Sequence, residues 1–252
     1  MILSVLTSPS RPYFDERVGR AWCRGTNGAV GPRRAQAIGS PPMQLAPHYP
    51  VTTARLRLRP LSLADVDGLV AYRSRLDVCR YVPFEPMDEA AVAARLSDRW
   101  ANHAITSDCD RLTLGVEIAA TGAIVGDVML RLVSETDRCG EVGWVFNPDH
   151  TGHGYATEAA HALLHMGFDD LGLHRMIARV DVRNSRSLRL GDRLAMRREA
   201  NLIENEWFKG AWSSEIDFAL LESEWTRQHA TTPAMCARPR IATLGNSPER
   251  SS

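Results

Sequence analysis

The stretch of sequence that decides the fold runs from Glu141 to Ala160 and reads EVGWVFNPDHTGHGYATEAA. Its first residues, Glu141–Phe146, have the apolar and aromatic character of a strand, and Asn147-Pro148 ends that strand. Gly152 and Gly154 then form a tight turn. An apolar stripe at helical spacing follows the turn and consists of Tyr155, Ala159, Leu163 and Met166. The stretch therefore predicts a strand that leads through a glycine turn into the start of a helix.

A helix that starts in a Gly-x-Gly turn is suited to bind an anion. Glycine lets a ligand approach the backbone and accepts a positive φ angle. The N–H groups of the first helical turn and the positive end of the helix dipole favour phosphate or pyrophosphate. The pattern is not a dinucleotide fingerprint, because the third glycine would fall at Thr157, and it lacks the Gly-Lys-Ser/Thr of a P-loop. An ordinary turn before a helix is the alternative interpretation.

Strand and helix patterns alternate on both sides of this stretch. The predicted strands lie at 55–59, 112–118, 128–132, 141–146, 176–182, 198–204 and 215–221. Two helices are expected after the N-caps Ser62 and Asp88, and two more over 155–166 and 185–194. The order β-α-α-β-β-β-α-β-α-β-β predicts an α/β fold in which helices pack on a mixed sheet.

The composition of the 252 residues is that of a globular protein, with 44% hydrophobic and 24% charged residues. These values exclude a wholly disordered chain, a collagen-like repeat and a disulfide-rich miniprotein. Thirty Lys and Arg residues balance thirty Asp and Glu residues. A general binder of nucleic acid or of membrane surfaces would carry a basic excess, so neither partner is expected.

The cysteines and the apolar runs favour a cytoplasmic protein. Five cysteines at wide spacing, without a C-x-x-C pair, do not predict a disulfide framework or a zinc knuckle. The sequence has no apolar run near the roughly 18 residues that span a membrane.

The two ends of the chain differ in composition from its centre. Residues 1–46 are rich in Gly, Pro, Ala and Arg without helical or strand periodicity, and residues 228–252 are similarly unpatterned. Such segments bury too little apolar surface to offset their ordering entropy, so both are expected to be disordered. The predicted folded domain covers residues 47–227.

The glycine loop and its flanks resemble a known family. The segment TGHGYATEA is similar to the acyl-CoA pyrophosphate loop of the GNAT acetyltransferase superfamily, and EVGWVFNP resembles the strand before that loop. Asn184 and Ser187 match a downstream Asn-x-x-Ser pattern, and the segments at 53–61 and 207–225 resemble the first strand and the final hairpin. The resemblance covers about residues 51–226 and is strongest to the branch of the ribosomal-protein N-terminal alanine acetyltransferases. It implies a central, mostly antiparallel sheet that is splayed at the acyl-CoA site, with helices on both faces.

The resemblance also implies the residues that bind acetyl-CoA, the expected co-substrate. They are Trp144, Val145, Phe146, Gly152, His153, Gly154, Tyr155, Ala156 and Asn184. Tyr155 is more typical of packing than of chemistry, and Asn184 could simply turn the chain. Two positions depart from the family pattern. Thr151 stands where Arg or Gln is usual, which leaves the pyrophosphate to backbone amides, and Ala195 replaces a glycine.

Acetyl transfer needs an unprotonated amine and a hydrogen-bond donor for the departing thiolate. The resemblance implies that Glu141 is the candidate base and acts directly or through water. It also implies that Ser187 is the candidate hydrogen-bond donor to the sulfur. The alternatives are a salt-bridge role for Glu141 and a helix cap for Ser187. Aromatic residues expected near the acceptor are Tyr72, Tyr81, Phe84, Trp207 and Phe208.

Two other groups of residues carry weaker signals. The pairs His150-x-x-His153 and His161-x-x-x-His165 have metal-ligand spacing, but no Cys or acidic ligand cluster accompanies them, so no metal is expected. An arginine-rich segment could contact RNA, although a solvated face is the favoured interpretation. It contains Arg175, Arg179, Arg183, Arg186, Arg189, Arg193, Arg197 and Arg198.

The sequence therefore predicts an N-acetyltransferase. It would pass an acetyl group from acetyl-CoA directly to a primary amine in a ternary complex, with a protein N-terminal amine as one acceptor and a small amine as another. A homodimer is compatible with this function. The alternatives are a catalytically silent acyl-CoA-binding domain of the same fold and, with less support, an RNA- or ribosome-binding module.

Overall fold

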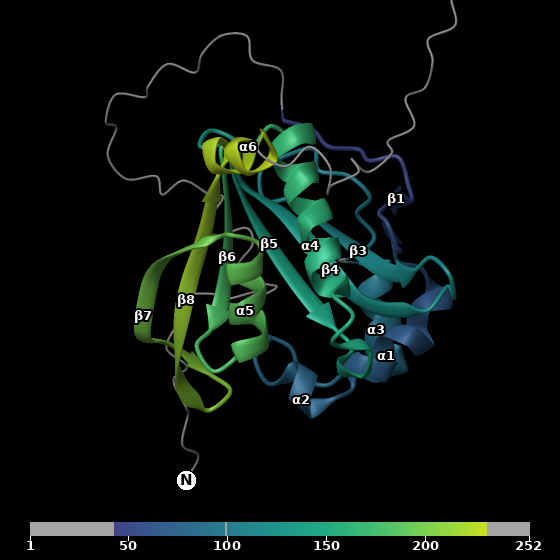
Figure 1. Cartoon of the computed structure of the whole chain (residues 1–252). Helices are drawn as coiled ribbons and strands as arrows, with labels where there is room; N and C mark the ends of the chain where they lie inside the picture. Colours follow the sequence, from purple (N-terminus) through teal and green to yellow (C-terminus); the bar gives the residue numbers. More distant parts are fainter. Residues whose placement is uncertain (1–42, 99, 231–252) are drawn as a thin grey trace, which may run out of the picture.

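The computed structural model describes residues 43–98 and 100–230, which are built around one eight-stranded sheet (Figure 1). The strands lie in the order β1-β2-β3-β4-β5-β6-β8-β7. Within this described part, all neighbouring strands are antiparallel except β5 and β6, which are parallel. The strands are β1 (Val51–Thr52), β2 (Leu56–Pro60), β3 (Arg111–Ile118), β4 (Ile124–Ser134), β5 (Cys139–Phe146), β6 (Arg175–Asp181), β7 (Arg197–Phe208) and β8 (Ala211–Leu221).

The helices follow the caps and stripes in the sequence. Asp88 caps a helix as predicted, because its side chain accepts a hydrogen bond of 2.8 Å from the Ala91 N–H. Ser62 and Asp65 form the capping box of the first helical segment. The helical elements are η1 (Leu63–Asp65), α1 (Val66–Arg73), α2 (Leu76–Cys79), α3 (Glu89–Ser97), η2 (Pro148–His150), α4 (Tyr155–His165), η3 (Met166–Asp170), α5 (Ser185–Arg193) and α6 (Glu222–Ala230).

Each predicted strand and helix is present, and three further elements were missed. The short strand β1 and the single turn α2 are too brief to show periodicity. The helix α6 is charged along most of its length, and Trp225 is its one buried residue. The final hairpin is also longer than predicted, because β7 and β8 extend to a turn at Lys209 and Gly210.

Helices cover both faces of the sheet, as the family resemblance implies. The larger hydrophobic cluster joins the sheet to α4 and α5 and includes Leu163, Leu164 and Leu190. The smaller cluster joins it to α1 and α3 and includes Leu69 and Val92. In Figure 1, α4 and α5 lie in front of the sheet and α1 and α3 lie behind it.

The sheet is splayed between β5 and β6. The two strands pair over three positions, from Cys139 opposite Arg175 to Glu141 opposite Ile177. Beyond Glu141, β5 still pairs with β4 as far as Phe146, and β6 still pairs with β8 as far as Asp181. The facing edges of β5 and β6 therefore separate in the middle of the sheet.

The described part of the chain extends beyond the predicted domain at both ends. Leu45 is buried and forms an isolated bridge with Ile105, and α6 continues to Ala230. The remainder of the two expected disordered segments lies outside the described residues. Among the described helices, none combines the length and apolarity that a membrane crossing requires. Cys79 and Cys139 are free thiols, whereas Cys109 is disulfide-bonded.

Candidate active site

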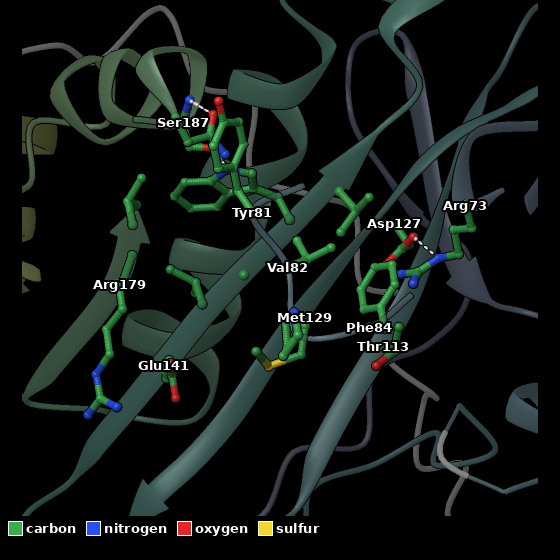
Figure 2. Close-up of a pocket in the computed structure, with 18 of the residues that line it drawn as sticks. Arg73, Tyr81, Val82, Phe84, Thr113, Asp127, Met129, Glu141, Arg179 and Ser187 are labelled. Atoms are coloured by element: carbon green, nitrogen blue, oxygen red, sulfur yellow. Dashed lines mark hydrogen bonds and ion pairs between the residues drawn. The ribbon is translucent and has the colours of Figure 1, made fainter. Parts of the chain in front are cut away.

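A cleft opens where β5 and β6 separate (Figure 2). Its empty volume, including the part open to solvent, is about 990 Å³. Residues from β5 and β6 form two walls, the start of α5 forms one end, and the segment 81–87 contributes on the side of α1 and α3. The splay thus creates a passage that is accessible from both faces of the sheet.

The alternation of side chains along β5 assigns the two faces of this passage. Glu141 and Val145 point to the face covered by α1 and α3, where Val145 packs against the smaller cluster. Val142 and Trp144 point to the face covered by α4 and α5. One strand therefore presents a carboxylate to one side of the sheet and an indole to the other.

Glu141 is buried, with 4% of its surface exposed, and lines the cleft. Its Oε2 lies 2.5 Å from Nη2 of Arg131 on the neighbouring strand β4. The salt-bridge role that the sequence left open is thus real. It does not preclude a second role, since a carboxylate has two oxygens and about four sites for hydrogen bonds.

Ser187 and Asn184 lie at the start of α5, at the other end of the cleft from Glu141 (Figure 2). Asn184 is the N-cap, because its Oδ1 accepts the Ser187 N–H at 3.1 Å. The Ser187 hydroxyl is therefore not the cap. It instead accepts a hydrogen bond of 3.2 Å from Nε1 of Trp144, which leaves its own hydrogen for another acceptor.

The glycine loop has the conformation that the sequence predicts. Gly152 and Gly154 have φ angles of +89° and +79°, which L side chains rarely adopt, and Gly154 is the N-cap of α4. The loop is exposed from Gly152 to Gly154, and the rings of His153 and Tyr155 stack with centroids 5.4 Å apart. The first N–H groups of α4 are thereby presented at a surface with no side chain at the cap.

A network of hydrogen bonds and one ion pair, formed by Arg55, Glu158 and Thr53, holds this loop and was not predicted from the sequence. Arg55 donates from Nη1 to the His153 carbonyl oxygen at 2.8 Å, and its guanidinium pairs with Glu158 at 2.7 Å. Glu158 also accepts a hydrogen bond from the Thr53 hydroxyl at 2.6 Å. Nη2 of Arg55 lies 3.5 Å from the place where a Cβ on Gly154 would stand. A cation thus sits beside the loop, close to the position where Thr151 replaces the usual Arg or Gln.

A buried ion pair forms the floor of the cleft on the α1 side. Arg73 contacts both oxygens of Asp127, at 2.6 and 3.1 Å, and the Tyr72 hydroxyl donates to the same carboxylate at 2.5 Å. Burial and the charge of Asp127 hold the pKa of Tyr72 well above its usual value, so its phenol stays neutral. Tyr72 therefore stabilises the buried ion pair of Arg73 and Asp127, and it does not line the cleft in which it was expected. The sequence gave no signal for this network, because its partners are more than fifty residues apart.

The final hairpin reaches over the cleft. Lys209, at the turn between β7 and β8, donates at 2.8 Å to the carbonyl oxygens of both Cys79 and Phe84. Tyr81 and Phe84 line the cleft as expected, whereas Trp207 lies exposed on the hairpin. The single lysine of the chain therefore fixes the segment that lines the cleft on the side of α1 and α3.

The arginine-rich segment is largely neutralised by acidic neighbours. Five of its eight arginines form ion pairs, namely Arg175 with Glu199, Arg179 with Asp217, Arg183 with Asp181, Arg197 with Glu199 and Glu224, and Arg198 with Asp192. A sixth, Arg193, donates to the Thr157 hydroxyl at 3.1 Å, beside the start of α4. This pairing weakens the case for an RNA-binding face.

Comparisons with known proteins agree with this geometry. A family model described as an acetyltransferase (GNAT) domain matches residues 55–197, which include the glycine loop and both walls of the cleft. YnaD of Bacillus subtilis (strain 168), described as an uncharacterized N-acetyltransferase, is 30% identical over 175 residues, which cover 69% of this chain and 98% of YnaD. The spermidine N(1)-acetyltransferase of Escherichia coli (strain K12) is 26% identical over 184 residues, which cover 73% of this chain and 95% of that enzyme. The crystal structure of spermidine N-acetyltransferase from Vibrio cholerae in complex with CoA and spermine has the same fold, with a TM-score of 0.59 at 21% identity over 69% of this chain and 99% of that one.

Proposed function

The chain belongs to the GNAT acetyltransferase family, and from this premise we propose that its cleft transfers an acetyl group from acetyl-CoA directly to a primary amine. The amine nitrogen attacks the thioester carbonyl, the C–S bond breaks, and CoA leaves as a thiolate while the amine loses a proton. The observation that carries the proposal is the open edge of β5 beside the glycine-capped start of α4. That arrangement offers backbone groups for an extended pantetheine arm and a helix N-terminus for a pyrophosphate.

The loop from Gly152 to Ala156 is the proposed pyrophosphate site. Its exposure, its two glycines with positive φ and the first turn of α4 support this role. Arg55 supports it further, because its cation braces the loop where Thr151 supplies none. The pantetheine arm would then run along Trp144, Val145 and Phe146, where β5 has no partner strand on its β6 side.

The two faces of β5 allow the donor and the acceptor to meet across the gap. Acetyl-CoA would approach from the α4 and α5 side, and the amine from the α1 and α3 side, where Glu141 faces the cleft. Glu141 is the proposed base, and the N–H of Val145 or Phe146 is the proposed donor to the oxyanion. Ser187 is the proposed donor to the thiolate, since Trp144 occupies one lone pair and leaves the hydroxyl hydrogen available.

The charges that line the cleft bear on the choice of acceptor. The Escherichia coli relative is named for spermidine, a polyamine with several positive charges. Here four arginines and three carboxylates line the cleft. The carboxylates of Asp127, Glu141 and Asp181 are each paired with an arginine. Because such a surface offers no surplus of negative charge, we propose an acceptor with a single amine, the N-terminal amine of a polypeptide.

The acceptor can be tested by measuring thiol release from acetyl-CoA with peptides of varied N-terminal residue, small monoamines and spermidine. We expect peptides to be turned over with a kcat/KM at least about tenfold above that of spermidine, which corresponds to 1.4 kcal/mol of differential binding in the transition state. A preference for spermidine would contradict the charge argument. The absence of thiol release with every amine tested would contradict the transferase proposal and favour a silent acyl-CoA-binding domain.

Replacing Gly154 tests the pyrophosphate site. Gly154→Val places a β-branched residue at a φ of +79° and a side chain where the anion should lie, so CoA affinity should fall by at least about tenfold. Gly122→Val is the matched control, because Gly122 has a φ of +74° in a turn between β3 and β4 and an open surface around it. Calorimetry with CoA on both variants separates loss of the site from general backbone strain. Equal CoA affinity in the two variants would remove the loop from the proposal.

Replacing Glu141 tests the base. Glu141→Gln should lower kcat by roughly 100-fold, the usual scale for loss of a general base, and the loss should be largest at low pH, where free amine is scarce. Arg131→Gln is the control, since it breaks the same ion pair but keeps the carboxylate. Rate profiles from pH 6 to 9 compare the two variants. If both variants lose activity equally, Glu141 serves only as the partner of Arg131.

Replacing Ser187 tests the donor to the sulfur. A hydrogen bond to a charged group contributes about 1.5–3 kcal/mol, so Ser187→Ala should lower kcat by roughly 10- to 100-fold. The KM for the amine should change little, because the interaction strengthens only as the thiolate forms. Ser185→Ala, at an exposed position two residues earlier on the same helix, is the control. A kcat for Ser187→Ala equal to that of the control would rule out this role.

A further inference from the structure

Three histidines converge at the end of α4 that is remote from the glycine loop. His161 and His165 lie one helical turn apart on α4, and His229 comes from α6, which packs beside α4 (Figure 1). The three ring centroids form a nearly equilateral triangle with sides of 5.2, 5.3 and 5.3 Å. One ring nitrogen from each histidine lies within 4.8 Å of the other two.

Hydrogen bonds fix the tautomers of two of these rings. Nδ1 of His165 lies 2.6 Å from Oδ2 of Asp169, and Nδ1 of His229 lies 2.8 Å from the Trp225 carbonyl oxygen. A carboxylate and a carbonyl only accept hydrogen bonds, so both Nδ1 atoms carry the hydrogen, and in the neutral ring this tautomer places the lone pair on Nε2. This is the arrangement in which outer partners orient histidines that bind a metal.

The lone pair of His165 has no partner in the part of the chain that the structure describes. His165 is 7% exposed, and its Nε2 is buried without a hydrogen bond. A buried polar atom without a partner destabilises the folded state, so its presence calls for an explanation. A ligand at the centre of the triangle would supply the missing partner.

The spacing of the rings fits a metal ion. Three imidazoles bound tetrahedrally at about 2.0–2.1 Å to one zinc ion place their ring centroids roughly 5 Å apart. The observed sides of 5.2–5.3 Å agree with that value.

Trp225 closes the cluster from the side of α6. It is buried, its ring centroid lies 3.8 Å from that of His229, and its Nε1 donates to Oδ1 of Asp169 at 3.0 Å. Asp169 thus binds both Trp225 and His165. The His165 and His229 rings are therefore held by neighbouring side chains, which favours a defined coordination geometry over a loose surface site.

We propose that His161, His165 and His229 bind a divalent transition-metal ion of the zinc type. Three neutral imidazoles suit Zn²⁺, Ni²⁺ or Cu²⁺ rather than Mg²⁺ or Ca²⁺. They fill three of four tetrahedral positions and leave the fourth to water. Because two ligands come from α4 and one from α6, the ion fastens the last described helix to the central one. No metal was expected from the sequence, because no Cys or acidic ligand cluster accompanies the pair His161 and His165. The third histidine, His229, lies 64 residues beyond His165 on a helix that was not predicted.

The site can be tested with Co²⁺ on the full chain, without an added histidine tag and after treatment with a chelator. We expect one equivalent of Co²⁺ to bind with the visible absorption of a tetrahedral ion, and Zn²⁺ to displace it and raise Tm. His165→Gln and His229→Gln should each lower the affinity by more than about 100-fold. Asp169→Asn should lower it by roughly 10- to 100-fold, the scale for loss of an outer partner.

His150→Gln is the matched control, because it removes a histidine of the other pair with metal-ligand spacing and should leave the affinity unchanged. Far-UV circular dichroism confirms the fold of each variant, and His161→Gln replaces any variant that fails to fold. The proposal is wrong if the wild-type chain binds no Co²⁺ at micromolar concentration and Zn²⁺ leaves Tm unchanged. It is also wrong if the histidine variants bind Co²⁺ as tightly as the wild type does. In that case the three rings only pack against one another.

Discussion

The separation of β5 from β6 is the constraint on which the rest of the structure depends. The two strands pair only as far as Glu141 and Ile177, and each then continues with a different neighbour. This leaves an unpaired strand edge in the middle of a sheet, where it is protected from other chains but open to a ligand. An edge in that position can bind an extended ligand without exposing the protein to aggregation.

Backbone groups and side chains have different proposed roles at the gap between β5 and β6. We propose that backbone groups of β5 and of the first turn of α4 bind acetyl-CoA. The loop before α4 is held by the ion pair and hydrogen bond of Arg55 with Glu158 and His153. Side chains from β5 and from the segment 81–87 face the other side. Backbone recognition suits a co-substrate that the whole family shares. Side chains can vary, which suits an acceptor that differs among relatives.

Much of the fold could be predicted because its signals are local. The alternation in β2 to β5, the cap at Asp88 and the glycine turn each depend on residues within one element or one turn. The missed elements have weak local signals, since α2 is four residues long and α6 buries one residue. The splay and the helices on both faces came from the resemblance to a family and not from periodicity.

The site was predictable only in part, for a related reason. The positions of Gly152 and Gly154 follow from the turn that they must form. The partners of the predicted residues do not, because Arg131, Trp144 and Arg55 reach them from other elements. Long-range contacts of this kind leave no trace in a single sequence. The same limit applies to His229, whose nearness to His161 depends on where the last helix packs.

The short pairing between β5 and β6 also has a consequence for how the chain folds. The strands β3, β4 and β5 follow one another with short connections, and β7 and β8 form a hairpin, so both groups need only local loop closure. Joining them requires the parallel contact between β5 and β6, whose crossover contains the whole of α4. Pairings between residues that are far apart in the sequence lose more entropy when the loop closes, and they form more slowly. The gap in which we propose that the reaction takes place is therefore also the boundary between two halves of the sheet, and we expect it to be among the last parts of the molecule to assemble.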